Sequence, residues 1–413
     1  MAINNIKYNN ICRISNSKKI VKILDLGLQP LANSLLDKRE EYKQEYPLTI
    51  SYSKKTKLIQ LNETINKEIL FNSYVWVTGT SKEVKEYSKK FFKFIINKLK
   101  IKKSDLIIEL ASNDGTFLKE FKKHNFKNIL GIDPAKNIVK IANNKNKIRT
   151  ICEYFNHKTS NKIKKKYGSA KLVIARNVIP HVSDLNSVIK GIKNLLNNES
   201  FGVIEFHDAA IIQNELHYDS IYHEHLCYFT INSFSKLLEH HKLYIVEYTK
   251  SKISGGSWVM VFKKNIKNHS KKIINLIKNE NNKKINSIKN WKLFAKKVYT
   301  HRQKTLNMIN KFSNKKIIGF GSSARSQTYL NFCQLDNKNI KFIIDNNKLK
   351  QGKFTPGSKI EIVSLKRGLA YKPDIIIILA WNFKNEIIKL CKENGFKGSF
   401  IIPFPNYPII IKS

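Results

Sequence analysis

Arginine, cysteine and long apolar stretches are all scarce in this 413-residue chain. Only seven of its 75 basic residues are arginine, the side chain that binds phosphate through paired hydrogen bonds. The five cysteines are odd in number, scattered and without a CxxC pair, which excludes a disulfide framework and indicates a reducing compartment. These absences argue against a secreted, disulfide-stabilised protein.

No apolar run reaches the ~18 residues that a membrane span needs, and the first residues lack the apolar stretch of a signal peptide. We therefore expect a cytoplasmic protein with no membrane partner. The sequence leaves the oligomeric state open, a monomer included.

The formal net charge of +44 comes almost entirely from lysine, which is spread along the whole chain beside abundant Asn and Ile. A nucleic-acid-binding protein would gather its basic residues on one face. We interpret the charge as compositional drift and predict no nucleic-acid partner.

The order of the predicted elements divides the chain into four regions. Residues 1–80 read as short strands and turns, and residues 81–265 as a helix followed by alternating strands and helices. Residues 266–313 read as a helical connector, and residues 314–413 as a second strand-and-helix series. Alternating strands and helices favour a parallel sheet covered on both faces. The middle region ends in two strands close enough in sequence to pair antiparallel, as in class I methyltransferases.

A short glycine loop in the middle region, DLIIELASNDGTFLKEF, carries the strongest chemical signal. A buried strand ends at Glu109, Gly115 follows in a short loop, and a helix begins near Thr116. The N-terminus of that helix offers unpaired N–H groups, and Asp133 stands at the tip of the next strand, where ribose hydroxyls are bound. The loop lacks the clustered glycines that suit a pyrophosphate, whereas Glu109 suits the sulfonium of S-adenosylmethionine. We therefore predict this cofactor.

A second glycine loop, from Gly319 to Ala324, fits the pattern G-x-G-x-x-A, and Asp345 stands at the tip of the following strand. Taken alone, this loop would indicate a dinucleotide site. Arg325 begins the helix after it and is placed to meet a diphosphate. A purely structural Rossmann-like domain is the alternative.

The run Tyr222-His223-Glu224-His225 is the strongest candidate for acid–base chemistry. It follows the fifth predicted strand, on the carboxyl edge of the sheet where ligands of open α/β sheets bind. A carboxylate beside a histidine fixes its tautomer and tunes its pKa toward neutrality. Metal binding by His223 and His225, and a purely structural hydrogen-bonded cluster, are the competing interpretations.

The chain resembles the sugar C-methyltransferase family, whose members methylate a carbon of nucleotide-linked keto-deoxysugars. Nearly the whole chain carries the resemblance, in the segments LDLGLQPLANSLL, ELASNDGTFLKEF, GIDPAKNI, NVIPHVSDL, IYHEHLCYFT, GFGSSARSQTYLNFC and IDNNKLKQGKFTPGSKI. The resemblance implies a small N-terminal zinc-binding lobe, a Rossmann-like class I methyltransferase core and a second, C-terminal Rossmann-like α/β domain that helps to hold a nucleotide sugar.

The resemblance also implies roles for individual residues. The acid–base residues are Tyr222, Glu224, His225 and His181. The residues that bind S-adenosylmethionine are Glu109, Asn113, Gly115, Asp133 and Asn177. The residues near the substrate are Trp76, where the family usually has tyrosine, together with Gly321 and Arg325.

One part of the family pattern is missing. The two CxxC pairs of the N-terminal lobe read here as Cys12, Ser15, Ser53 and Thr56. Tetrahedral zinc needs thiolate or imidazole donors, and neutral hydroxyls are poor substitutes. We therefore predict that this lobe binds no zinc.

These observations predict a methyltransferase that transfers a methyl group to the carbon beside the ketone of a nucleotide-linked keto-deoxysugar. In this hypothesis His225 removes a proton from the carbon, and Tyr222 or His181 hydrogen-bonds to the enolate oxygen. An O- or N-methyltransferase of another small molecule, a nucleic-acid methyltransferase and a weakly active or non-catalytic relative are the alternatives.

Overall fold

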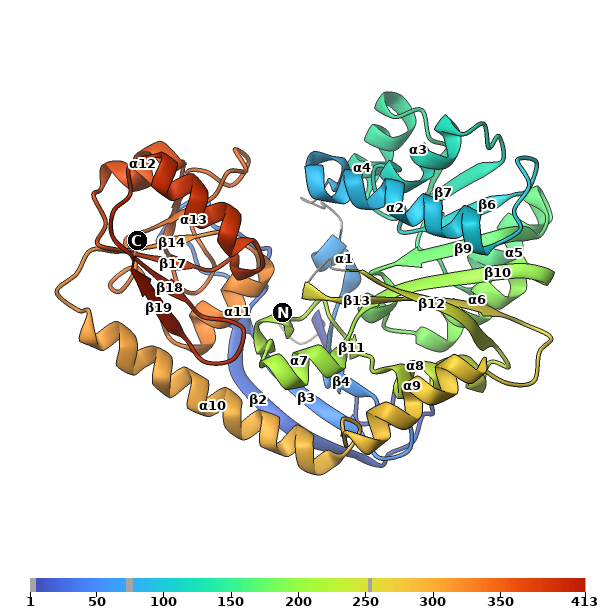
Figure 1. Ribbon diagram of the computed structural model, residues 1–413, viewed down its shortest axis with the longest axis horizontal. Helices are drawn as coiled ribbons and strands as arrows, with labels where there is room; N and C mark the ends of the chain where they lie inside the picture. Colours follow the sequence, from blue (N-terminus) through green and yellow to red (C-terminus); the bar gives the residue numbers. More distant parts are fainter. Residues whose placement is uncertain (1–4, 72–76, 252–254, 413) are drawn as a thin grey trace.

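The computed structural model describes residues 5–71, 77–251 and 255–412. Figure 1 shows two separate α/β regions, with the N-terminal strands and the long helix α10 (Ile288–Lys311) running between them. Trp76 lies outside the described residues.

The middle region is built on a seven-stranded sheet in the order β12-β13-β10-β9-β6-β7-β8. Its strands are β6 (Ile107–Leu110), β7 (Ile129–Asp133), β8 (Thr150–Cys152), β9 (Ala170–Arg176), β10 (Leu196–His207), β12 (Tyr244–Ser251) and β13 (Ser257–Lys263). Strands β6 to β10 are parallel, whereas β13 is antiparallel to both β10 and β12. The predicted parallel sheet with an antiparallel end is therefore confirmed.

Helices cover both faces of this sheet, as the strand–helix alternation predicts. They are α2 (Lys82–Lys98), α3 (Thr116–Lys123), α4 (Lys136–Lys140), α5 (His157–Tyr167), α6 (Leu185–Leu195), α7 (Ala209–Glu215) and α8 (Ile231–His240), with short turns η3 (Ile141–Lys145), η4 (Ile179–His181) and η5 (Tyr218–Ser220). Phe91 of α2 and Phe117 of α3 share one apolar cluster, whereas Ile163, Ile189 and Phe234 of α5, α6 and α8 belong to another. The sheet therefore has an apolar core on each of its faces, and β6 is buried on both sides.

The C-terminal region has a six-stranded sheet in the order β16-β15-β14-β17-β18-β19. Its elements are β14 (Ile317–Phe320), α11 (Ala324–Phe332), β15 (Phe342–Ile344), β16 (Glu361–Val363), α12 (Leu365–Ala370), β17 (Ile375–Ile378), η7 (Trp381–Phe383), α13 (Lys384–Glu393), β18 (Ser399–Ile402) and β19 (Ile409–Lys412). All of its strands are parallel except β19. In both sheets the strand order reverses beside the first strand, so each has a crevice at its carboxyl edge.

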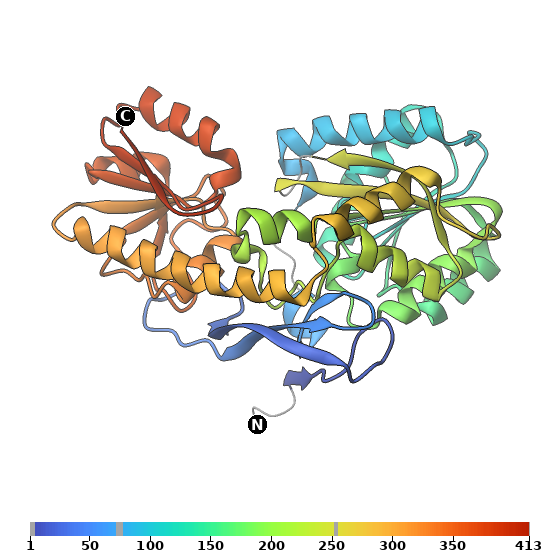
Figure 2. The same cartoon turned by 60° about the horizontal axis from the view of Figure 1, so that its bottom comes forward.

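The N-terminal lobe and the connector bridge the two sheets. The lobe contains β1 (Ile6–Tyr8), β2 (Ile20–Pro30), β3 (Glu45–Ser53), β4 (Ile59–Leu61), β5 (Glu63–Ile65), α1 (Lys67–Phe71) and η2 (Thr78–Thr80), and the connector contains α9 (Lys271–Asn282) and α10 (Ile288–Lys311). Figure 2 shows the lobe (blue) lying below the two α/β regions, beside α10.

The sheet of the lobe has four strands, in the order β11-β4-β3-β2. Its edge strand β11 (Cys227–Tyr228) comes from the middle region and pairs with β4 directly after the Tyr222–His225 run. The lobe is therefore joined to the segment that carries the candidate acid–base residues.

Candidate active site

The first glycine loop forms the crevice at the tip of β6. Ala111, Asn113 and Gly115 all have positive φ angles, of 50°, 51° and 78°. A Cβ atom on Gly115 would lie 2.9 Å from Ile148, so glycine is required here both for its conformation and for space. The loop thereby turns sharply into α3, whose first residue is Thr116 as predicted.

Asp133 holds this loop in place from the tip of β7. One of its carboxylate oxygens accepts from the N–H of Asn113 and the other from the N–H of Ala135, each at 2.9 Å. Burial raises the pKa of Asp133, and these two hydrogen bonds oppose the rise. Each carboxylate oxygen keeps a further lone pair, which is what a ribose hydroxyl needs.

Glu109 is buried at the end of β6 and pairs with an arginine that the sequence analysis did not single out. Its Oε1 lies 3.4 Å from Nε of Arg176, whose Nη1 lies 3.2 Å from Glu205. Burial raises the pKa of Glu109 to about 7, against the lowering effect of Arg176. Its Oε2 has no hydrogen-bond partner among the described residues. This unmet acceptor fits a cationic ligand such as S-adenosylmethionine.

The remaining predicted cofactor residues lie at the same edge of the sheet. Asn113 accepts from the N–H of Thr78 at 2.8 Å, so the segment before α2 lies against the cofactor loop. Asn177 directly follows β9, with φ at 49°. The structure thus brings all five predicted cofactor residues to the tips of β6, β7 and β9.

The Tyr222–His225 run forms a chain of hydrogen bonds. Nδ1 of His225 lies 2.8 Å from the carbonyl oxygen of Ser220, to which it donates. Its other ring nitrogen, Nε2, therefore carries the lone pair and accepts from the Tyr222 hydroxyl at 2.7 Å. Backbone and side chain together fix the tautomer of His225.

His181 completes this group from η4, after the tip of β9. Its ring lies edge-on to that of His225, with the ring centroids 4.8 Å apart. Burial lowers the pKa of His181 to about 4, so the imidazole is neutral at neutral pH. The structure therefore brings together two neutral histidines and a tyrosine.

Glu224 points toward the N-terminal lobe instead of toward His225. Its carboxylate accepts from the side-chain amide of Asn33 at 2.5 Å, and burial raises its pKa to about 7. Glu224 and His181 both line a cavity of about 270 Å³ whose other wall includes Asn66 and Lys67 of the lobe. Asn33 lies in the segment LDLGLQPLANSLL, which carries the family resemblance but gave no signal of this contact.

His223 has a different environment from His225. Its Nε2 donates to the carbonyl oxygen of Pro47 at 3.1 Å, and its ring packs edge-on against Tyr46. No group of three or more His, Cys, Asp or Glu side chains within residues 5–71, 77–251 and 255–412 is placed to hold a metal ion. His223 is thus hydrogen-bonded to the N-terminal lobe, whereas His225 is hydrogen-bonded to residues of its own segment.

The second glycine loop repeats the geometry of the first. Asp345 accepts from the N–H groups of Ser322 and Asn347, at 2.9 and 2.8 Å. Gly321 has a φ of 96°, and a Cβ there would lie 2.4 Å from that of Ala380. Here, however, Nζ of Lys350 lies 3.3 Å from the Asp345 carboxylate.

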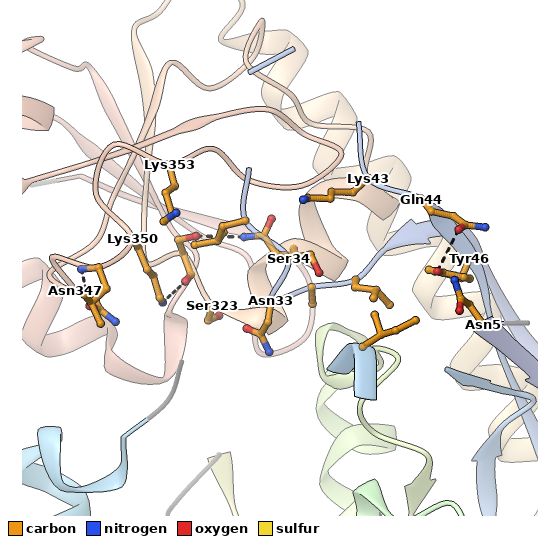
Figure 3. A pocket seen from close by; sticks show the side chains of 17 residues that line it. Asn5, Asn33, Ser34, Lys43, Gln44, Tyr46, Ser323, Asn347, Lys350 and Lys353 are labelled. Carbon is orange, nitrogen blue, oxygen red and sulfur yellow. Dashed lines mark hydrogen bonds between the residues drawn. The ribbon is translucent and has the colours of Figure 1, made fainter. Parts of the chain in front are cut away.

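A pocket of about 500 Å³ opens beside this second loop, between the C-terminal domain and the N-terminal lobe. Figure 3 shows Lys350 and Ser323 on one side and Lys43 and Tyr46 on the other. Asn33 also lines this pocket, and its side-chain amide donates to Glu224, which lines the smaller cavity.

Arg325 is the second residue of α11, which begins one residue earlier than predicted, at Ala324, and its guanidinium binds a carboxylate of the protein. It donates two hydrogen bonds to Asp219 of η5, at 3.0 and 2.9 Å, and lies over the ring of Trp381. Whether it also meets a diphosphate stays a prediction. Trp76, the third predicted substrate residue, lies outside the described residues.

The four positions of the missing zinc ligands fall in two turns of the lobe. Sγ of Cys12 lies 3.1 Å from the hydroxyl of Thr56, which donates to that of Ser53 at 3.0 Å. One thiol and three hydroxyls do not make a zinc site, because neutral hydroxyls are poor ligands for this metal. The residues present therefore do not fit zinc.

Comparison with known proteins assigns the class first. Residues 82–248 match the family model described as "Methyltransferase domain", residues 252–405 match "C-methyltransferase C-terminal domain", and residues 12–71 match "Putative zinc binding domain". With the sheet order and the cofactor loop, these matches define an enzyme of Rossmann-like fold that depends on S-adenosylmethionine.

The kind of methyltransferase follows from the same matches and from a relative that spans the chain. C-methyltransferase NovU of Streptomyces niveus is 28% identical over 97% of this chain and 96% of its own length. Together with the match to the C-methyltransferase C-terminal domain, this relative identifies the chain as an S-adenosylmethionine-dependent C-methyltransferase.

Solved methyltransferase structures resemble less than half of this chain. Magnesium protoporphyrin IX methyltransferase of Synechocystis PCC 6803 is 10% identical and covers 44% of this chain and 79% of its own, with a TM-score of 0.34. A methyltransferase of Clostridium acetobutylicum is 15% identical, covers 44% and 91%, and has a TM-score of 0.33. The fold assignment rests on the sheet topology, not on these likenesses. No helix within the described residues is long and apolar enough to cross a membrane.

Proposed function

We propose that the enzyme methylates the carbon beside the ketone of a nucleotide-linked keto-deoxysugar. The observation that carries this proposal is the hydrogen-bonded chain Tyr222–His225–Ser220 beside His181. A carbon acid must lose a proton before it can attack a methyl group, whereas many oxygen and nitrogen nucleophiles need no such base. A fixed, neutral imidazole supplies that base.

The state of His225 suits the removal of a proton. Burial holds the pKa of His225 well below its usual value, and the neighbouring His181 and Arg325 lower it further, against the Ser220 hydrogen bond. The imidazole is therefore neutral at neutral pH. Its lone pair is on Nε2, because Nδ1 donates to Ser220.

The proton leaves the substrate carbon through the Tyr222 hydroxyl. As Tyr222 Oη takes the carbon proton, its own proton passes along the 2.7 Å hydrogen bond to Nε2 of His225. The electrons of the broken C–H bond form the enolate, and His181 hydrogen-bonds to its oxygen. The enolate carbon would then be the nucleophile for the methyl group that a bound cofactor supplies, with the electrons of the broken carbon–sulfur bond remaining on the departing thioether, and His225 returns its proton to solvent.

When bound, S-adenosylmethionine supplies an electrophilic methyl group on a positively charged sulfur. Glu109, Asn113, Gly115, Asp133 and Asn177 are the residues that would hold it. Asp133 offers acceptors for ribose hydroxyls, and the unmet oxygen of Glu109 offers one for the cationic end.

The nucleotide end of the substrate fits the pocket of about 500 Å³ at the second glycine loop. Lys43, Lys350 and Lys353 line it. Each pairs with a carboxylate of the protein, and a diphosphate would compete with these carboxylates for the lysine charges. Asn33, between this pocket and Glu224, lies on the path toward the acid–base group.

Deuterium exchange tests the enolisation without the methyl transfer. The chain is incubated in D₂O with S-adenosylhomocysteine, which has no methyl group to give, and a panel of nucleotide keto-deoxysugars. NMR should show exchange at the carbon beside the ketone, and H225N should slow it by roughly 10²–10⁴-fold.

The exposed histidine of α8 provides the matched control, since H240N removes an imidazole away from the site. It should exchange at the native rate. Unchanged exchange in H225N, with methylation intact, would contradict the proposal and favour an oxygen or nitrogen acceptor.

A further inference from the structure

Asp219, three residues before Tyr222, is held by two elements of the C-terminal domain. Its buried carboxylate accepts from Nε and Nη2 of Arg325 at 3.0 and 2.9 Å, and from Nε1 of Trp381 at 2.8 Å. A two-pronged guanidinium–carboxylate contact fixes orientation as well as distance. The middle and C-terminal domains are thus joined beside the acid–base group.

The residues around Asp219 are also hydrogen-bonded to the connector and the C-terminal domain. The Tyr218 hydroxyl lies 3.0 Å from Nδ1 of His301 in α10, and the carbonyl of Ile221 accepts from Thr328 of α11 at 2.8 Å. His301 in turn donates to the carbonyl of Pro403 at 2.8 Å. Residues 218, 219 and 221 are therefore all anchored outside the middle domain.

Ser220 lies in the middle of these anchored residues, and its carbonyl oxygen accepts from His225. We propose that the C-terminal domain positions the base: Arg325 holds Asp219, and this contact places the Ser220 carbonyl that fixes the tautomer of His225. Arg325 and Asp219 are then positioning residues. This inference rests on the proposed function, because it assigns roles to the residues around the same base.

The inference differs from a direct role of Arg325 in binding a diphosphate. A diphosphate ligand would make Arg325 important for substrate affinity and Asp219 dispensable. A positioning contact makes the two residues a unit, so that loss of either one has the same effect on turnover.

Steady-state kinetics with the nucleotide keto-deoxysugar that the native enzyme accepts separates the two roles. We expect R325Q and D219N each to lower kcat by roughly 10–100-fold, with little change in KM. The double variant should be no worse than either single one. R367Q, which removes an exposed ion pair with Glu361 in the same domain, should match the native enzyme.

Nitrogen NMR of ¹⁵N-histidine in the full chain reads the tautomer of His225 without any substrate. The native chain should show a proton on Nδ1 of His225, and D219N and R325Q should show a mixture of tautomers. R325K, which keeps the charge but loses the two-pronged contact, should give an intermediate result if R325Q fails to fold.

Two results would overturn the inference. One is a rise in KM for R325Q alone, with D219N behaving as the native enzyme. The other is an unchanged His225 signal in folded variants of both residues. Neither result touches the proposed function, which the deuterium exchange of the native chain decides separately.

An independent observation concerns the N-terminal lobe, where two turns have the same shape. In one, Asn16 N–H donates to the carbonyl of Cys12, and in the other Lys57 N–H donates to that of Ser53, both at 2.9 Å. Asn16 and Lys57 also share positive φ angles, of 54° and 63°. The paired turns that would present four metal ligands are therefore kept, although three of the four ligands are hydroxyls.

We infer that the lobe folds without zinc and that hydrogen bonds among Cys12, Ser53 and Thr56 replace the metal cross-link. The lobe also has other ties: buried Arg13 donates to the carbonyls of Leu61 and Glu63. These contacts hold the two turns together in place of a metal.

Metal analysis and thermal unfolding of the full chain test this inference. The native chain should carry no stoichiometric zinc, and a chelator should leave its Tm unchanged. T56V, which removes the hydroxyl between Cys12 and Ser53, should lower the Tm by roughly 1–3 °C.

The combined variant S15C/S53C/T56C restores four thiols on the two turns. It should bind about one zinc per chain and become sensitive to the chelator. Stoichiometric zinc in the native chain, with a fall in Tm on chelation, would overturn the inference. The native measurement decides the question even if the combined variant fails to fold.

Discussion

The two glycine loops share one architecture but differ in charge. In each, a strand ends in a tight turn, a helix follows, and an aspartate at the tip of the next strand accepts two backbone N–H groups. The four hydrogen bonds of Asp133 and Asp345 are 2.8–2.9 Å long. Lys350 pairs with Asp345, whereas no lysine or arginine among the described residues forms an ion pair with Asp133.

This difference in charge indicates which kind of ligand each loop is suited to bind. An aspartate without a cation keeps its negative charge and its acceptors for a cationic ligand with hydroxyl groups. An aspartate paired with lysine leaves less negative charge at the loop, which favours an anion beside the nearby lysines. In our proposal, one backbone design thus serves a sulfonium cofactor at the first loop and a diphosphate at the second.

The largest expected effect comes from adding a methyl group at one glycine of each loop. G115A and G321A should each cost about 2–4 kcal/mol of unfolding free energy, because both combine a positive φ with a close contact. G395A, which has a positive φ but open space, should cost only about 1 kcal/mol.

Denaturant unfolding measures these costs, and calorimetry of the folded variants compares the two loops. Among them, G115A should lose S-adenosylmethionine binding and G321A should keep it. Equal loss in both variants would remove the assignment of the cofactor to the first loop.

Replacement of the two aspartates should give the next largest difference in cofactor affinity between the loops. D133N should weaken S-adenosylmethionine by about 10–100-fold, since it removes a charged acceptor. D345N, with the same backbone contacts, should leave that affinity within about twofold. Isothermal calorimetry measures both affinities. An equal effect of both changes would contradict the difference between the two loops.

The pH dependence of cofactor binding should follow Glu109. Its pKa of about 7 lies above the ordinary value for glutamate, so the chain without ligand loses stability as pH rises from about 4.5 through 7. The cofactor is cationic and prefers the ionised carboxylate. Its affinity should therefore fall about tenfold from pH 8 to pH 6, and E109Q should remove most of this dependence.

Removal of the lysine charge at the second loop should have the smallest effect. K350M should raise the KM for the nucleotide sugar by about 3–10-fold and leave S-adenosylmethionine binding unchanged. K397M, on the exposed surface of the same domain, is the control. A loss of cofactor affinity in K350M would contradict the division of roles between the loops.

Much of the site was predictable because strand tips can be located from the sequence. Glu109, Asp133 and Asn177 each follow or end a run of buried residues, and parallel strands bring their tips to one edge. Tyr222 and His225 are three residues apart, so their contact is local as well. The structure places all of these residues where the strand pattern predicts.

Other parts of the site depend on contacts between distant segments. Asn33 reaches Glu224 across 191 residues, Arg325 reaches Asp219 across 106, and Arg176 reaches Glu109 across 67. No periodicity in the sequence encodes such pairs, since each depends on how separate elements pack. The sequence placed Glu224 beside His225, for instance, but packing turned its carboxylate toward the lobe.

The sequence by itself determined the strand–helix order, both glycine loops and the acid–base run, because all of these are patterns within a few residues of one another. Only the tertiary structure decided which domain holds the base, what Arg325 binds and how the two hydroxyl-bearing turns of the lobe meet. Those outcomes arise where three regions of the chain come into contact, and the chemistry of such a contact belongs to no single segment.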